Sequence, residues 1–427
     1  MQEDFLHYIW KFKKFDFGNA QTVDGSQIVI SNTGIHNTNS GPDFFNARIK
    51  IGEQSWAGNV EIHIKSSYWY AHHHEEDPNY DNVILHVVWE DDIAIYRKDN
   101  SVIPTLELKN LVKQDTLKNY SNLLLAPNSK WINCENDFPA FQEFELNNWL
   151  ERLYLEKLQK KSEVIKELHK ATGNNWEAVL FQLLARSFGS KVNAGSLLSL
   201  AQSLEFKIIQ KCGDSQLMLE ALFFGQSGLL DNRAEDGYFS VLKEEYNFLK
   251  RKFRLENGVV ERPKYFRLRP DNFPTIRLSQ LASLYSAQPH LFSSVIKIKS
   301  REELHKILQS ETSGFWKTHF NFGKPHSPRN KRLSDDFIDL IIINTIIPIK
   351  YSWLEITGSG DSSEILQLIN EIKAEKNSIV EKYNLIRPGT SETALQSQAL
   401  LHLKTEYCDK NYCMQCQLGA ELLKRET

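Results

Sequence analysis

The stretch GPDFFNARIKIGEQSWAGNVEIHIK, from Gly41 to Lys65, decides the fold of the N-terminal part of the chain. It predicts two strands, FNARIKI and NVEIHIK, with a turn at GEQ between them. Successive side chains of a strand alternate between its two faces, so Glu61, His63 and Lys65 share one face. The apolar residues between them share the other face, which we expect to pack on a core. The polar face either meets solvent or forms a site.

Helical and strand-like patterns surround this stretch. Residues 5–15 place apolar side chains at helical spacing, which predicts an opening helix. Runs rich in β-branched residues, separated by turn signals, predict further strands at 26–31, 82–89 and 92–97. Beyond residue 142 the pattern becomes that of amphipathic helices, and the first of them is predicted at 144–170.

These patterns predict two domains. Residues 1–125 form an α/β (α+β) domain, residues 126–142 a boundary loop with two prolines, and residues 143–427 a larger, mainly α-helical domain with a cysteine-rich tail. We expect this tail to belong to the helical domain.

The composition is that of a soluble globular protein, because 41% of the 427 residues are apolar and 25% are charged. The most apolar run, FIDLIIINTIIPI at 337–349, is shorter than the roughly 18 residues of a membrane span and contains Asp339 and Pro348. It predicts a buried helix or strand. The first residues lack the pattern of a secretory signal, so we expect a cytoplasmic protein without a membrane partner.

Acidic and basic residues are unevenly distributed, although the net charge is only -3. Residues 53–92 contain nine acids and one base, whereas residues 250–299 contain eleven bases and three acids. The basic stretch is interleaved with aromatic residues, a combination that suits phosphates and unpaired bases. Ordinary solvated helix faces give the same pattern. The residues predicted to hold a nucleic-acid backbone are Arg267, Arg269, Lys324 and Arg329.

Asp43 precedes the first strand of the opening stretch, where a hairpin can bring its carboxylate beside Glu61. Two such carboxylates form an oxygen-rich site that suits Mg²⁺ or Mn²⁺. A cation held there would polarise a phosphoryl oxygen and lower the pKa of a bound water. Lys65 or His63 could then position the water or the scissile phosphate.

The opening helix, the GPD motif and the E-x-H-x-K strand resemble the PD-(D/E)XK nuclease superfamily. The resemblance implies a restriction-endonuclease-like mixed sheet, with Asp43 and Glu61 as metal ligands together with the backbone carbonyl of Ile62. It also implies an acid from the first helix, Glu3 or Asp4. His63 stands where the superfamily has a lysine, and Lys65 could substitute for it.

The whole chain also resembles an uncharacterised bacterial family of the domain-of-unknown-function type. The phrases that carry this second resemblance include FLHYIWKF, GPDFFNARI, GNVEIHIKSSYW and RPDNFPTIRLSQLA. It implies no activity.

The loop after the opening stretch contains three consecutive histidines, His72 to His74, and His86 lies in the next predicted strand. Imidazole suits Zn²⁺ or Fe²⁺ better than Mg²⁺. Three interpretations remain open: a solvated loop, a role for His74 or His86 in lining the carboxylate site, and a separate metal site that includes Asp77.

The tail cysteines Cys408, Cys413 and Cys416 have the spacing C-x4-C-x2-C. Their C-x2-C part chelates a tetrahedral metal well, and Cys134, Cys212 or a histidine could complete the set. Zinc, an iron–sulfur cluster and simple thiols are the alternatives. Some nucleases of the PD-(D/E)XK group resemble this arrangement, with an iron–sulfur cluster held by one early and three late cysteines.

The hypothesis with the most support is a Mg²⁺- or Mn²⁺-dependent nuclease that hydrolyses phosphodiester bonds in DNA or RNA. One alternative is a non-catalytic platform of the same fold that binds nucleic acid or protein, motivated by His63 in place of lysine. Another is a Zn²⁺- or Fe²⁺-dependent hydrolase that uses the His-rich loop.

Overall fold

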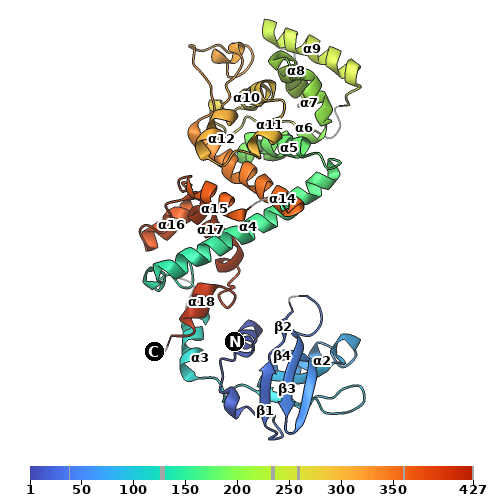
Figure 1. Cartoon of the computed structure of the whole chain (residues 1–427), viewed down its shortest axis with the longest axis vertical. Helices are drawn as coiled ribbons and strands as arrows, with labels where there is room; N and C mark the ends of the chain where they lie inside the picture. Colours follow the sequence, from blue (N-terminus) through green and yellow to red (C-terminus); the bar gives the residue numbers. More distant parts are fainter. Residues whose placement is uncertain (38, 126–129, 232–235, 257–259, 359–360, 426–427) are drawn as a thin grey trace. The chain divides into compact units, whose positions relative to one another are not determined.

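The computed structural model describes residues 1–37, 39–125, 130–231, 236–256, 260–358 and 361–425. The chain divides into two compact units, of which the first comprises Met1–Trp149 with Leu403–Thr427 and the second comprises Leu150–His402. Figure 1 shows strands in the blue, N-terminal part of the chain and helices in its green to red part.

A mixed sheet of six strands forms the first unit. Its strands are β1 (Ile28–Asn32), β2 (Ile35–His36), β3 (Phe44–Ile51), β4 (Gln54–Lys65), β5 (Val83–Glu90) and β6 (Thr105–Glu107). Their order is β1-β3-β4-β5-β6, and β2 pairs with β3. Strand β3 pairs antiparallel with β1 and β4, whereas β5 pairs in parallel with β4 and β6. The predicted combination of an N-terminal sheet domain and a helical region is therefore confirmed.

The prediction of a strand at residues 92–97 was wrong. The chain forms an isolated bridge there, between Tyr96 and Val102. It reverses too soon for a strand, because the N–H of Arg97 donates to the carbonyl of Ser101 and Asp99 accepts from the N–H of the same serine. Strands β2 and β6 have two and three residues, and such short strands leave no readable alternation in a sequence.

The opening helix is α1 (Glu3–Lys11), which packs five buried side chains, Phe5, Leu6, Tyr8, Ile9 and Trp10, into the first unit. Further helices of this unit are α2 (Tyr68–Ala71), α3 (Gln114–Tyr120) and α18 (Gln417–Leu422). Both α1 and α2 lie against β4, the strand that carries Glu61 and His63.

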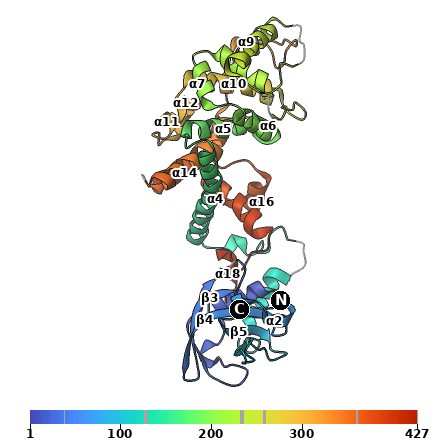
Figure 2. The same ribbon diagram turned by 90° about the vertical axis from the view of Figure 1, so that its right-hand side faces the viewer.

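The second unit is helical. Helix α4 (Glu143–Ala171) begins in the first unit and continues into the second. The others are α5 (Trp176–Phe188), α6 (Ser190–Gln202), α7 (Phe206–Cys212), α8 (Gln216–Gln226), α9 (Gly237–Phe253), α10 (Pro274–Ala287), α11 (Leu291–Val295), α12 (Arg301–Leu308), α13 (Asp335–Ile341), α14 (Ile347–Thr357), α15 (Ser362–Asn370), α16 (Ser378–Ile386) and α17 (Ala394–His402). Figure 2 shows the same helices after a quarter turn.

The C-terminal tail groups with the sheet, whereas the sequence assigned it to the helical domain. The hydroxyl of Tyr8 donates to the carbonyl of Ala420 (3.2 Å), and the amide of Asn119 donates to the carbonyl of Arg425 (2.9 Å). Of the predicted boundary loop, residues 126–129 lie outside the described residues, and residues 130–142 belong to the first unit.

The most apolar run, predicted to be a buried helix or strand, forms a helix. Helix α13, a π-helical turn at Ile342–Ile346 and α14 follow one another without a break. Among the described residues, this helix, Asp335–Thr357, is long and apolar enough to cross a membrane, but 61% of its apolar window is buried inside the structure. Burial explains the apolar composition without a membrane.

Candidate metal centre on the sheet

The hairpin brings Asp43 beside Glu61 at the edge of β4. Pairing between β3 and β4 ends at Phe44 and Val60, so the N–H groups of β4 beyond that point are available to other partners. The N–H of Ile62 donates to Oδ2 of Asp43 (2.9 Å). In return, the N–H of Asp43 donates to Oε2 of Glu61 (3.1 Å). These reciprocal bonds fix both carboxylates.

The second oxygen of Glu61 faces two imidazoles. Its Oε1 lies 3.3 Å from Nε2 of His74 and 3.5 Å from Nε2 of His63. Glu61 is 5% exposed and His63 is 2% exposed, so the polar face of β4 is buried where they lie. Burial, together with the charge of Asp43, raises the pKa of Glu61 to about 9. A carboxyl group in such surroundings needs a cation before it can ionise.

Four histidines form a connected cluster around His63. Its Nδ1 lies 2.8 Å from Nε2 of His86, and its Nε2 lies 3.1 Å from Nδ1 of His72. The His63 and His74 rings are stacked with centroids 5.3 Å apart. Burial lowers the pKa of His63 to about 2 and that of His86 to about 3. Both rings are therefore neutral, which is the form that binds metals.

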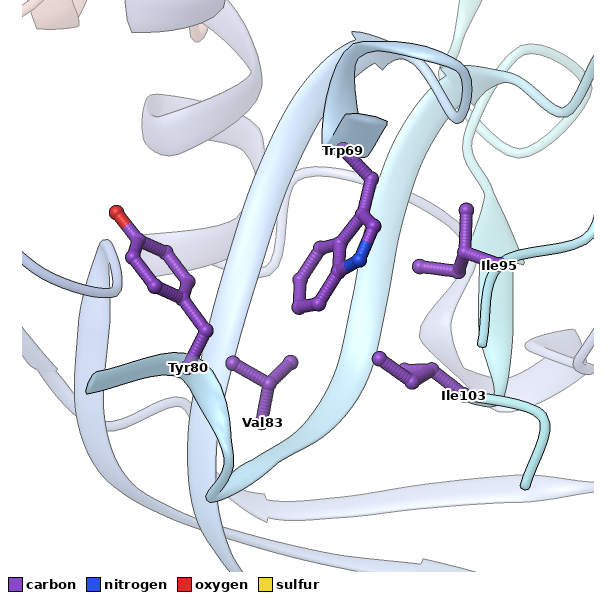
Figure 3. Packing of buried hydrophobic residues seen from close by; sticks show 5 residues of the cluster. All are labelled: Trp69, Tyr80, Val83, Ile95 and Ile103. Carbon is purple, nitrogen blue, oxygen red and sulfur yellow. The ribbon is translucent and has the colours of Figure 1, made fainter. Parts of the chain in front are cut away.

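The loop after α2 turns His72 and His74 toward this cluster. The intervening His73 has a φ of 59°, a left-handed conformation. The ring of His74 stacks on that of Tyr80 at 3.8 Å. A buried apolar cluster supports this arrangement, and Figure 3 shows its residues Trp69, Tyr80, Val83, Ile95 and Ile103. Trp69 also packs edge-on against His74 and His86.

The ligand atoms fit one metal ion. His63, His72 and His74 each offer a nitrogen, and these nitrogens lie within 4.8 Å of one another. Bonds of 2.0–2.1 Å to a tetrahedral ion place neighbouring ligand atoms about 3.3 Å apart. Three distances agree with this value: 3.1 Å between His63 and His72, 3.3 Å between His74 and Glu61, and 3.5 Å between His63 and Glu61. We therefore assign Glu61, His63, His72 and His74 as a candidate metal centre.

Helix α1 adds two groups beside this centre. Burial and the charge of Asp43 raise the pKa of Glu3, whose carboxylate also accepts from the N–H of Ile64. Nε2 of His7 lies 3.3 Å from Oδ2 of Asp43. Burial alone would lower the pKa of His7, but its contact with Asp43 raises it on balance. Sequence reasoning missed His7, and the signal that could have found it is its i,i+4 spacing from Glu3 on α1.

Two other predicted residues lie away from the centre. Lys65 is at the end of β4, opposite Glu90, and its charge acts on Asp92. Asp77 caps a 3-10 turn, Pro78–Tyr80, by accepting from the N–H of Asn79 (2.9 Å). The loop histidines and the hairpin carboxylates thus share one site, while Asp77 stabilises the turn beside it.

The predicted nucleic-acid contacts lie in the helical unit. Arg267, Arg269, Lys324 and Arg329 are all exposed. Arg329 pairs with Asp271 (2.8 Å), which brings the two basic segments together. Residues 257–259 of the longer basic stretch lie outside the described residues.

Comparison with known families identifies the chain at the level of its family. It belongs to the family described as "Protein of unknown function (DUF2851)", whose model matches residues 3–378. This DUF2851 match covers the candidate metal centre and most of the helical unit, and it ends before the tail cysteines. No curated protein and no solved structure matches the chain.

Proposed function

We propose that this protein is a metal-dependent hydrolase of phosphodiester bonds in DNA or RNA, with a restriction-endonuclease-like sheet. The observation that carries the proposal is the edge of β4, where the Glu61 and histidine centre adjoins Asp43 and Glu3. Carboxylates from a helix, a strand start and a central strand gather at that edge. Such a set combines metal ligands with groups that orient water and phosphate.

The donor set favours a first-row transition metal over Mg²⁺. Three imidazoles and one carboxylate suit Mn²⁺, Fe²⁺ or Zn²⁺, whereas Mg²⁺ prefers oxygen ligands. Of the predicted Mg²⁺ or Mn²⁺, we therefore retain Mn²⁺. The Zn²⁺ or Fe²⁺ alternative no longer requires a separate site, because His74 and Glu61 adjoin (3.3 Å).

The contacts of the residues around the candidate metal centre indicate a separate role for each of them. A bound metal would polarise the phosphoryl group and lower the pKa of a water. His86 orients the ring of His63 through their 2.8 Å contact. Contact with Asp43 raises the pKa of His7 and so favours its charged form, which could donate to a phosphoryl oxygen. His7 would then have the role that the resemblance to the PD-(D/E)XK superfamily assigns to a lysine.

The helical unit supplies the second argument for a polyanionic substrate. Phe266 is 76% exposed, and the guanidinium of Arg267 lies 5.2 Å from the centre of its ring. An exposed aromatic ring beside exposed cationic side chains suits stacking on an unpaired base. Single-stranded nucleic acid is accordingly the substrate form that we propose first.

The test is cleavage by the full-length protein. Single- and double-stranded DNA and RNA are incubated with Mn²⁺, Fe²⁺, Zn²⁺ or Mg²⁺, with a chelator as the blank. We expect cleavage with a transition metal, loss of cleavage in Glu61→Gln, and full activity in Glu90→Gln. Glu90 is the matched control because it lies on the neighbouring strand and pairs with Lys109 (3.3 Å).

Two results would contradict the proposal. Cleavage that survives in Glu61→Gln would place the reaction elsewhere. Salt-sensitive binding of nucleic acid without cleavage under any of these metals would favour the binding platform instead.

A further inference from the structure

Four cysteines from two distant parts of the chain line one pocket of the first unit. Cys134 comes from the loop before α4, and Cys408, Cys413 and Cys416 come from the tail. The remaining lining is largely apolar and includes Leu123, Ile132, Phe138, Leu403 and Leu418. All five cysteines of the chain are thiols, and Cys212 lies on α7 of the other unit.

Hydrogen-bond donors are aimed at the sulfur atoms. The side-chain amide of Asn133 donates to Sγ of Cys413 (3.3 Å). The sulfur of Cys416 accepts from the backbone N–H groups of Leu418 and Gly419. N–H donors of this kind stabilise negative charge on sulfur and accompany metal-bound thiolates. A neutral thiol is a weak acceptor and has little need of them.

The tail is shaped to hold its cysteines close to α18. A Cβ on Gly419 would lie 2.1 Å from the carbonyl oxygen of Cys413, so only glycine permits this approach. Asn411 has a φ of 56° in the tight turn between Cys408 and Cys413, and its side chain accepts from Asn133 (3.0 Å). This turn, held to the Cys134 loop, presents the tail sulfurs to the pocket.

The pocket disfavours four thiolates that have no cation. Burial raises the pKa of Cys134 well above its usual value, and the neighbouring tail cysteines raise it further. Burial likewise raises the pKa of Cys416 to about 11. A metal reverses this preference, because coordination deprotonates thiols that are otherwise buried in neutral form. A cavity of about 20 Å³ remains inside the pocket.

We propose that Cys134, Cys408, Cys413 and Cys416 are the ligands of one thiolate metal centre. Four sulfur ligands suit zinc or iron in a cluster with sulfide, and both share this chemistry. The centre ties the tail to the Cys134 loop across more than 270 residues of sequence, since Cys134 and Cys408 are 274 positions apart. It is independent of the hydrolase site, whose ligands are imidazoles and a carboxylate.

The experiment measures zinc, iron and acid-labile sulfide in full-length protein purified without oxygen. We expect either one zinc per chain in a colourless protein, or iron with sulfide and broad visible absorption. Cys413→Ser should lose that metal and Cys212→Ala should keep it. Because a ligand variant can misfold, thiol alkylation of the unaltered protein is the second measurement. The four pocket cysteines should be protected until a chelator is added.

Several results would overturn the proposal. One is a folded protein that contains no metal apart from the metal that Glu61→Gln removes. Another is prompt alkylation of the pocket cysteines in the absence of chelator. A third is a disulfide between Cys413 and Cys416. Metal that is lost in Cys413→Ser while metal-dependent cleavage persists would support the thiolate centre and leave the hydrolase proposal intact.

Discussion

Two buried carboxylates, Glu61 on β4 and Glu220 on α8, show how a structural acid differs from one that forms a site. Glu220 is 0% exposed and Glu61 is 5% exposed, so burial does not separate them. Their partners do. Glu220 accepts from the Tyr238 hydroxyl (2.6 Å), the Ser279 hydroxyl (2.6 Å) and the Trp316 indole (3.2 Å).

Glu61 receives the N–H of Asp43, but its other oxygen faces imidazole nitrogens at 3.3 and 3.5 Å. Three side-chain donors satisfy the oxygens of Glu220, whereas burial and Asp43 raise the pKa of Glu61 to about 9. A satisfied carboxylate holds a fold together. A carboxylate among neutral imidazoles has the surroundings of a metal ligand.

The largest expected effect is loss of stability in Glu220→Gln. Hydrogen bonds to a charged group contribute about 1.5–3 kcal/mol each, and the amide also points a donor at groups that are themselves donors. We expect the free energy of unfolding to fall by roughly 3 kcal/mol. Denaturant titration followed by circular dichroism measures this fall. Glu205→Gln is the control, because its exposed side chain should change stability by less than about 0.5 kcal/mol.

For Glu61→Gln we expect little change in the stability of the metal-free protein and a large loss of metal affinity. The amide resembles the protonated carboxyl that a pKa of about 9 implies near neutrality, so metal-free stability should change by less than about 0.5 kcal/mol. Metal affinity should fall by more than about 100-fold, beyond the usual effect of groups that only orient ligands. Calorimetric titration with Mn²⁺ and Zn²⁺ measures the affinity. The comparison fails if Glu61→Gln destabilises the metal-free protein as much as Glu220→Gln.

The sequence predicted those parts of the site that depend on local pattern. Alternation along β4 placed Glu61 and His63 on one face, and the GPD turn placed Asp43 at the next strand. The structure brings these three together. The alternation alone could not show that this face is buried, because the loop after α2 contacts it through His72 and His74, and such packing depends on tertiary contacts.

Other parts of the site and the fold could not be predicted, because they depend on single residues or on distant contacts that leave no pattern in the sequence. Which of three consecutive histidines contact His63 and Glu61 is decided by the left-handed His73 and by the stacking of His74 on Tyr80. The tail was assigned to its neighbour in sequence, yet its contacts are with Tyr8 and Asn119, more than 300 positions away. Helices with long periodic runs, such as 144–170, were predicted within one residue at each end.

A smaller loss of metal affinity is expected when one of the loop histidines is replaced. His74→Ala removes a ligand but leaves three, so we expect metal affinity to fall by about 100-fold. His73→Ala is the matched control in the same loop, since His73 is not one of the grouped ligands, and the metal affinity of this variant should be unchanged. Equal losses in both variants would mean that the loop conformation matters and the imidazole does not.

The smallest effect is expected of His86→Leu, because His86 orients a ligand without being one. Its Nε2 lies 2.8 Å from Nδ1 of His63, while its own Nδ1 is buried without a hydrogen-bond partner among the described residues. Leucine removes a polar ring that burial keeps neutral, so the melting temperature with chelator should not fall. Metal affinity should fall by about 10-fold, because His63 loses the group that holds its ring in place. A lower melting temperature with unchanged affinity would make His86 a core residue, as Glu220 is.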